Sequence, residues 1–126
     1  MLYVYEATLT AGQTKLDEVI TDCPLQFGRV KRIEVNFPRG CCGLVYVAID
    51  KNNVQVIPTN CTYYLRAENE TISIACDFKN HDTPFLFRFR AYNTDDFFTH
   101  TIQVRFYLEE PFDPDVINSE ITQEVF

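Results

Sequence analysis

Hydrophobic and polar residues alternate along three segments of the chain, residues 71–78, 85–92 and 101–108. The apolar series are Ile72, Ile74, Cys76 and Phe78; Phe85, Phe87, Phe89 and Ala91; and Ile102, Val104, Phe106 and Leu108. Because successive side chains of a strand point to opposite faces, this alternation predicts three strands with these apolar residues facing a core.

Six further segments show a weaker strand pattern, and they are residues 2–9, 16–20, 30–37, 44–50, 54–57 and 62–65. Short polar segments with turn-forming residues separate them, and the segment from Asp50 to Asn53 suits a tight hairpin because asparagine tolerates a positive φ. About eight short strands near ten residues apart, without a convincing helix, indicate an all-β sandwich or barrel. We expect a jelly-roll-like β-sandwich.

The pattern changes at the C-terminus, and we expect a β-sandwich domain over residues 1–108 and an acidic arm over residues 109–126. Pro111 and Pro114 cannot continue a strand ladder. From Glu109 onward there are six acidic residues and no lysine or arginine. The arm also carries Val116, Ile117, Ile121, Val125 and Phe126 at regular spacing. Two interpretations remain open: a solvated tail, or an arm that docks on a neighbouring subunit as a helix or as an extended strand.

Charge and composition exclude several classes of function. The chain has 126 residues, 46% of them hydrophobic, and a net charge of −7 that lies almost entirely in the arm. We expect no nucleic-acid partner, because a basic stripe that could displace counterions from phosphate is missing. No apolar run approaches the roughly 18 residues of a membrane span, and the start does not resemble a signal peptide. We therefore expect no membrane partner and synthesis in the cytoplasm.

The five cysteines are expected to be free thiols, because the protein is expected to be made in a reducing compartment. They lack the spacing of a zinc site. The adjacent pair Cys41 and Cys42 lies in an expected turn, where an intermolecular disulfide is the alternative.

Catalytic chemistry has no support in the sequence, so we expect a protein that is not an enzyme and needs no cofactor or metal. His81 and His100 lie near no nucleophile motif. Asp95 and Asp96 fit a turn better than an acid–base pair.

Tyrosine and arginine side chains on the outward positions of the expected strands are the candidate contacts with other subunits, since both are enriched in protein interfaces. The candidates on the sandwich are Tyr46, Arg88, Arg90, Tyr92, Arg105 and Tyr107, and those on the arm are Phe112, Ile117, Ile121, Val125 and Phe126. The alternative for the sandwich residues is aromatic and cation–π packing across strands within one subunit.

Two turn segments contain residues with structural roles. Pro38 fixes φ, while Gly40 and Gly43 allow a sharp reversal before a buried strand. Asn93 can close an Asx turn in the segment of Asp95 and Asp96, and His100 is placed to meet these acids.

These two segments resemble small β-sandwich virion proteins of tailed bacteriophages. Residues 37–45 match an F-P-x-G-x-x-G-L-V pattern, and residues 93–104 match N-x-D-D followed by H-T-I-x-V. Tyr92 stands where the pattern has tryptophan, and Cys41 and Cys42 replace residues that usually include proline or alanine.

The resemblance implies a structural virion component without an active site, a decoration or minor capsid protein or one near the neck. Its partners would be other virion proteins, such as major capsid or neck and tail proteins, and copies of itself in a homo-oligomer. A receptor- or glycan-binding module on the particle surface, with a loop cluster around Tyr63, Tyr64 and Asn93, is the alternative.

Overall fold

The computed structural model describes residues 1–26, 28–60, 62–80 and 87–109. Its elements, in chain order, are β1 (Leu2–Leu9), the 3₁₀ turn η1 (Lys15–Asp17), β2 (Val19–Cys23), β3 (Gly28–Phe37), β4 (Val45–Lys51), β5 (Val54–Ile57), β6 (Glu70–Asn80), β7 (Phe87–Asn93) and β8 (His100–Glu109).

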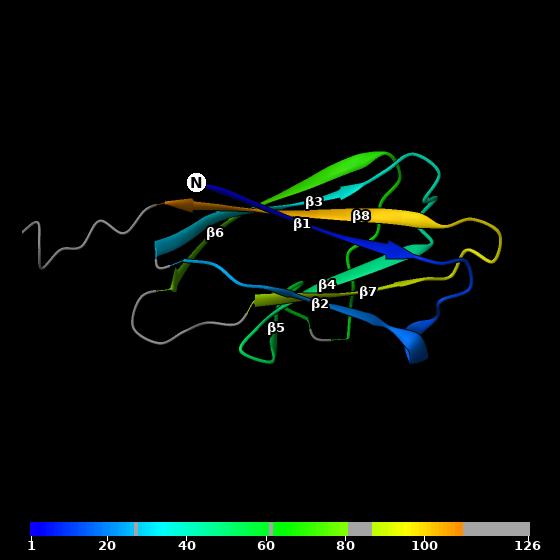
Figure 1. Ribbon diagram of the computed structural model, residues 1–126, viewed down its shortest axis with the longest axis horizontal. Coiled ribbons are helices and arrows are strands. Elements are labelled where there is room, and N and C mark those ends of the chain that lie inside the picture. Colours follow the sequence, from blue (N-terminus) through cyan, green and yellow to red (C-terminus); the bar gives the residue numbers. More distant parts are fainter. Residues whose placement is uncertain (27, 61, 81–86, 110–126) are drawn as a thin grey trace, which may run out of the picture.

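The eight strands form two antiparallel sheets that face each other (Figure 1). One sheet has the strand order β1-β8-β3-β6, and the other has the order β2-β7-β4-β5. Consecutive strands therefore alternate between the sheets along most of the chain, as in a jelly roll of two Greek keys. The expected all-β, jelly-roll-like sandwich is confirmed.

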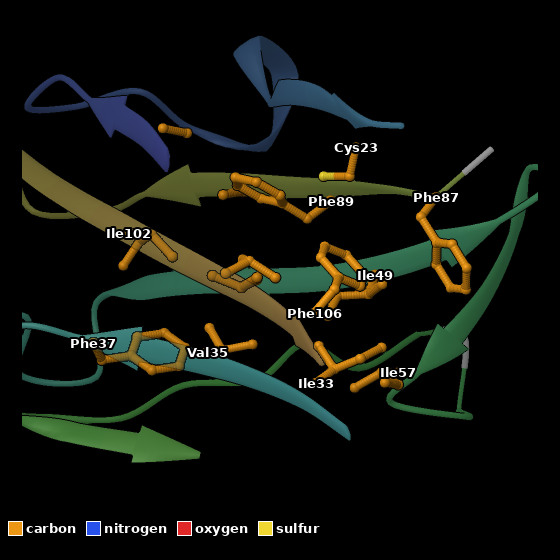
Figure 2. Close-up of a cluster of buried hydrophobic side chains, with 14 of the residues drawn as sticks. Cys23, Ile33, Val35, Phe37, Ile49, Ile57, Phe87, Phe89, Ile102 and Phe106 are labelled. Carbon is orange, nitrogen blue, oxygen red and sulfur yellow. The ribbon is translucent and has the colours of Figure 1, made fainter. Parts of the chain in front are cut away.

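The space between the sheets is filled by inward apolar residues from both sheets, from the three alternating segments and from the other strands. Phe37, Phe87, Phe89 and Phe106 are fully buried there. Figure 2 shows Phe89 and Ile49 of one sheet and Val35 and Phe37 of the other within this core. The faces that we predicted for β7 and β8 are therefore the observed ones. On the edge strand β6 the inward residues are half-buried and pack against the core.

A two-residue turn joins β4 to β5, and Lys51 pairs with Val54 across it. Asn52 and Asn53 have φ values of 52° and 68°. Positive φ at both central residues is the signature of a type I′ turn, whose twist matches that of the flanking strands. The tight hairpin expected at this place is confirmed.

Two of the strand predictions are wrong, one in its position and the other altogether. Residues 16–20 were expected to form one strand, but Leu16 lies in η1 and β2 begins at Val19. Residues 62–65 form no strand, and their one ladder contact is an isolated bridge between Leu65 and Val47.

The boundary between the sandwich and the arm lies one residue later than expected. Glu109, assigned to the arm, is the last residue of β8 and pairs with Arg29. Residues 85 and 86, expected in the strand that became β7, lie outside the described residues, as does the rest of the arm, residues 110–126.

Candidate interaction surfaces

Three tyrosines pack into one cluster on the outer face of the β2-β7-β4-β5 sheet. Tyr46 of β4 and Tyr92 of β7 are paired in the ladder, and their rings stack with centroids 4.6 Å apart and planes 7° apart. Tyr64, from the segment between β5 and β6, packs edge-on at 6.3 Å from Tyr46 and 5.1 Å from Tyr92. We call Tyr46, Tyr64 and Tyr92 the tyrosine cluster.

Two arginines flank the tyrosine cluster. The guanidinium of Arg66 lies 4.5 Å from the ring centroid of Tyr46, and its Nε donates to the carbonyl of Gly43 at 2.8 Å. Arg90 lies 5.4 Å from the ring centroid of Tyr64 and donates from Nη1 to the Tyr64 hydroxyl at 3.0 Å. Such cation–π contacts hold both the ring and the guanidinium in place.

Arg90 is also the centre of an ion-pair network within the chain. Its Nε lies 2.9 Å from Oδ2 of Asp50, its Nη1 lies 3.6 Å from Oε1 of Glu18, and its Nη2 donates to Oε1 of Gln55 at 2.6 Å. Burial opposes the charged form of Arg90, but the hydrogen bond to Asp50 and the nearby negative charges raise its pKa above the ordinary value. The contacts of Arg90 therefore lie within its own subunit, as in the alternative of packing across strands.

The Tyr64 hydroxyl completes this network by donating to Oε2 of Glu18 at 2.6 Å. Burial and this hydrogen bond raise the pKa of Tyr64 to about 12, so the phenol stays neutral and remains a donor at neutral pH. Hydrogen bonds from this charged network thus fix Tyr64 within the tyrosine cluster. Because the rings are already ordered, binding of a partner would cost little side-chain entropy.

Arg88 is the other outward arginine of β7, and it faces β2. Its Nε lies 3.6 Å from Oδ1 of Asp22, whose side chain is largely exposed. In a pair this open to solvent, most of the attraction is screened. Arg88 is therefore less strongly held than Arg90.

Arg105 and Tyr107 lie on the outer face of the other sheet, and both donate to Oε1 of Glu34. The Tyr107 hydroxyl is at 2.9 Å and the Arg105 Nη1 at 3.3 Å from this atom. Arg32 lies over the Tyr107 ring, 4.1 Å from its centroid. The hydrogen bond from Tyr107, followed by that from Arg105, lowers the pKa of Glu34. The structure brings these two candidates together, but on the sheet opposite to the tyrosine cluster.

The loop between β7 and β8 is shaped by Asn93, which is fully buried. Its Oδ1 accepts the backbone N–H of Asp95 at 2.9 Å, which is the Asx turn, and its Nδ2 donates to the carbonyls of Leu9, Thr10 and Phe98. The side chain of Asn93 thereby ties this loop to the end of β1.

Asp95 and His100 form a buried pair beneath the same loop. Oδ2 of Asp95 lies 2.9 Å from Nε2 of His100, and Oδ1 accepts the backbone N–H groups of Phe97 and Phe98 at 2.9 and 3.2 Å. The hydrogen bond with His100, together with these N–H groups, lowers the pKa of Asp95. Asp96, its neighbour, is exposed.

The tip of this loop carries two phenylalanines that the sequence analysis missed. Phe97 is 84% exposed and Phe98 is 67% exposed. Two adjacent large apolar residues in a polar turn segment are the signal that could have indicated them, since neither continues the alternation of a strand. Exposed aromatic side chains on a hydrogen-bonded loop are typical of contact sites.

The turn between β3 and β4 follows the pattern expected from its proline and glycines. After Pro38, Gly40 and Gly43 have φ values of 101° and 72°. The carboxylate of Glu68 accepts the backbone N–H of Gly40 at 3.0 Å and that of Cys42 at 2.7 Å. These two hydrogen bonds, the one from Cys42 first, lower the pKa of Glu68.

The four cysteines among the described residues, Cys23, Cys41, Cys42 and Cys76, are free. Burial raises the pKa of Cys41 to about 11 and that of Cys23 to about 12. Of the adjacent pair, Cys41 is buried and Cys42 is exposed, so only Cys42 is placed to react with another chain.

The arm candidates Phe112, Ile117, Ile121, Val125 and Phe126 lie outside the described residues. Within the described ranges, no cluster of three or more histidine, cysteine, aspartate or glutamate side chains is arranged to hold a metal ion. In the same part of the chain, no helix has both the length and the apolar character that a membrane crossing requires.

Comparison with protein-family models gives no match, and comparison with curated protein sequences gives none either.

Proposed function

We propose that this chain is a non-enzymatic structural component of a tailed-phage virion, either a decoration or minor capsid protein of the head or a protein near the neck. It binds copies of itself and other virion proteins through its sheet faces and its C-terminal arm. The observation that carries the proposal is the jelly-roll topology with the tyrosine cluster on one outer face. The jelly roll is a recurrent architecture of capsid and lectin domains.

The tyrosine cluster supports contact with a protein partner. Tyrosine and arginine are the residue types in which binding energy concentrates, and they act best when they are already held in the bound conformation. Here the stacking of Tyr46 on Tyr92 and the contacts of Arg66 supply this order before any partner arrives.

Phe97 and Phe98 give the sandwich a second contact site at one end. The hydrogen bonds from their backbone N–H groups to Asp95 fix the loop that carries them. Fully burying one phenylalanine removes about 150–250 Å² from solvent. The pair therefore supplies less than the roughly 800 Å² that each partner of a stable complex buries. Such a contact becomes strong when a particle presents many copies and other surfaces bind at the same time.

A receptor- or glycan-binding module on the particle surface is the second candidate, and Tyr63 is the observation in its favour, because it is 63% exposed. The sugar-binding cluster expected around Tyr63, Tyr64 and Asn93 has one unfavourable member. Asn93 is fully buried and its amide bonds three backbone carbonyls, so it is not available to a sugar.

The proposal is tested by deleting residues 110–126 and measuring incorporation into particles sedimented from the cells in which the chain is naturally made. We expect the deleted chain to fold, because β8 is complete at Glu109, and to be lost from the particles. A chain in which a glycine–serine segment of equal length replaces residues 110–126 is the matched control, and it should also be lost. Normal incorporation of either variant would contradict the role of the arm.

A further inference from the structure

One end of the β1-β8-β3-β6 sheet carries a cationic patch on its outer face, which we define as Arg29, Lys31, Arg32 and Lys79. This is the end at which β3 begins and β6 and β8 finish (Figure 1). Arg29 and Lys79 are paired across β3 and β6. All four side chains are exposed or half-exposed. The patch is a positive region in a protein whose net charge is −7.

The described residues place fewer carboxylates than cations in this patch. Arg29 donates from Nη1 to both oxygens of Asp77 at 2.9 Å, and Lys31 Nζ lies 3.8 Å from the same carboxylate. Arg32 Nε lies 3.4 Å from Glu34. Lys79 makes no ion pair with any residue that the structure describes. Among the described residues, Asp77 and Glu34 thus pair with three of the cations, and Glu109 is the ladder partner of Arg29. Four cations face three carboxylates, so the patch can accept further negative charge.

Exposed aliphatic side chains lie beside the cations. Leu2 and Val4 point outward from the edge strand β1 and are 51% and 45% exposed. Leu2 is paired with Tyr107, and Arg32 packs over the ring of Tyr107. This end of the sheet therefore offers positive charge and apolar surface together.

The sequence of the arm has the complementary composition. Residues 110–126 hold five acidic residues and no lysine or arginine, together with Val116, Ile117, Ile121, Val125 and Phe126. An acidic segment with aliphatic residues suits a surface that combines cations with exposed leucine and valine, since charge complementarity gives specificity and apolar contact gives affinity.

The two prolines of the arm sequence cannot donate to a strand ladder, so the sequence does not continue β8 through the arm. Each proline fixes φ near −65°, and the residue before a proline is biased toward extended backbone. Pro111 and Pro114 follow within five residues of the last residue of β8. At about 3.1 Å per residue, a Pro-rich segment of four residues such as 111–114 spans about 12 Å. A chain of twelve residues, the length of the segment 115–126, spans at most about 40 Å when it is fully extended.

We propose, as a specific form of the proposed function, that residues 115–126 of a second copy of this chain dock on the cationic patch and on Leu2 and Val4. The arm starts at the same end of the sandwich that carries the patch. Two copies related by a twofold axis at this end therefore exchange arms reciprocally, as isologous contacts require.

The test measures self-association of the purified full-length chain by sedimentation equilibrium at low and at high salt. We expect a dimer whose dissociation constant rises with salt, because exposed charges are screened. The double variant Lys31→Glu and Lys79→Glu leaves the Arg29–Asp77 pair in place and should raise the dissociation constant at least about tenfold, since like charges then meet in the contact.

Arg39 is exposed between β3 and β4, at the opposite end of the sandwich. The variant Arg39→Glu is therefore the matched control for the single variant Lys79→Glu, since both change the net charge by the same amount. Its dissociation constant should change by less than about threefold. Adding Glu120→Lys and Glu124→Lys to the Lys31→Glu and Lys79→Glu variant restores complementary charges and should recover most of the lost affinity.

A chain that stays monomeric at every concentration would overturn the inference, and this includes an arm that folds onto its own subunit. So would equal effects of Lys79→Glu and Arg39→Glu, or a failure of the charge exchange to restore affinity. These outcomes leave the proposed function standing if deletion of residues 110–126 still prevents incorporation. In that case the arm binds a different virion protein.

Discussion

The loop at the tip of the sandwich depends on two side chains, Asn93 and Asp95, which replace a regular ladder with hydrogen bonds of their own. Asn93 bonds three carbonyls, and Asp95 bonds two backbone N–H groups and His100. A buried carboxylate in this arrangement is stabilised in its charged form. The hydrogen bonds that hold the loop carrying Phe97 and Phe98 therefore also stabilise the charged form of Asp95.

Asp95→Asn should lower the melting temperature at about pH 5 and lower it less at about pH 3. The pKa of Asp95 is lowered in the folded chain. The stability that its charge contributes is present above the unfolded pKa of about 3.9, and it is lost as the pH falls through the lower folded pKa. Glu34, Glu68 and Asp77 also have lowered pKa values, but they titrate in both proteins and cancel in the difference. A difference in melting temperature that stays constant across this range would contradict the role of the Asp95 charge.

At the scale of elements, the hairpin between β4 and β5 is a local feature with a local cause. Asn52 and Asn53 both adopt positive φ, which most residue types resist. The turn holds β5, a strand of four residues, against the edge of β4. Gln55 of β5 in turn reaches Arg90, so the hairpin contributes to the network under the tyrosine cluster.

Asn53→Ala should destabilise the chain by about 1 kcal/mol, because alanine at a φ of 68° meets the steric cost of the left-handed region. Asn53→Gly should leave stability unchanged within a few tenths of a kcal/mol, since glycine adopts this conformation freely. Urea unfolding of the two variants beside the unmodified chain measures both values. Equal losses for alanine and glycine would show that the asparagine side chain, and not the backbone conformation, holds the turn.

Much of the element pattern could be predicted from the sequence, because alternation is a local property. β1 and β5 have the expected bounds, and the inward residues of β7 and β8 are those predicted. Leu16 was misplaced because an apolar residue at a strand start looks the same whether it is buried or, as here, almost fully exposed. Residues 62–65 have strand-forming tyrosines, but Tyr64 packs on the outer face of the sheet.

The candidate surfaces were less predictable, because they depend on contacts between distant segments. The outward positions of Tyr46 and Tyr92 follow from alternation, whereas their stacking follows from the register of β4 on β7. The use of Arg90 inside the chain depends on Glu18 and Asp50, which come from two other parts of the sequence. A pattern of single residues does not contain such pairings.

The whole molecule is a jelly roll, and the proposed contact surfaces lie on different sides of it. The tyrosine cluster lies on one sheet, the cationic patch on the other, and Phe97 and Phe98 lie at the end opposite to the patch. A subunit with contacts in several directions can join several neighbours at once, and repeated copies then add avidity.

A density map of the assembled particle tests the central claim most directly, because it shows which chain each surface touches. We expect residues 110–126 to lie on another subunit, and the tyrosine cluster to be covered by a neighbouring protein. A map in which those residues return to their own sandwich, and in which both outer sheet faces are bare, would contradict this expectation.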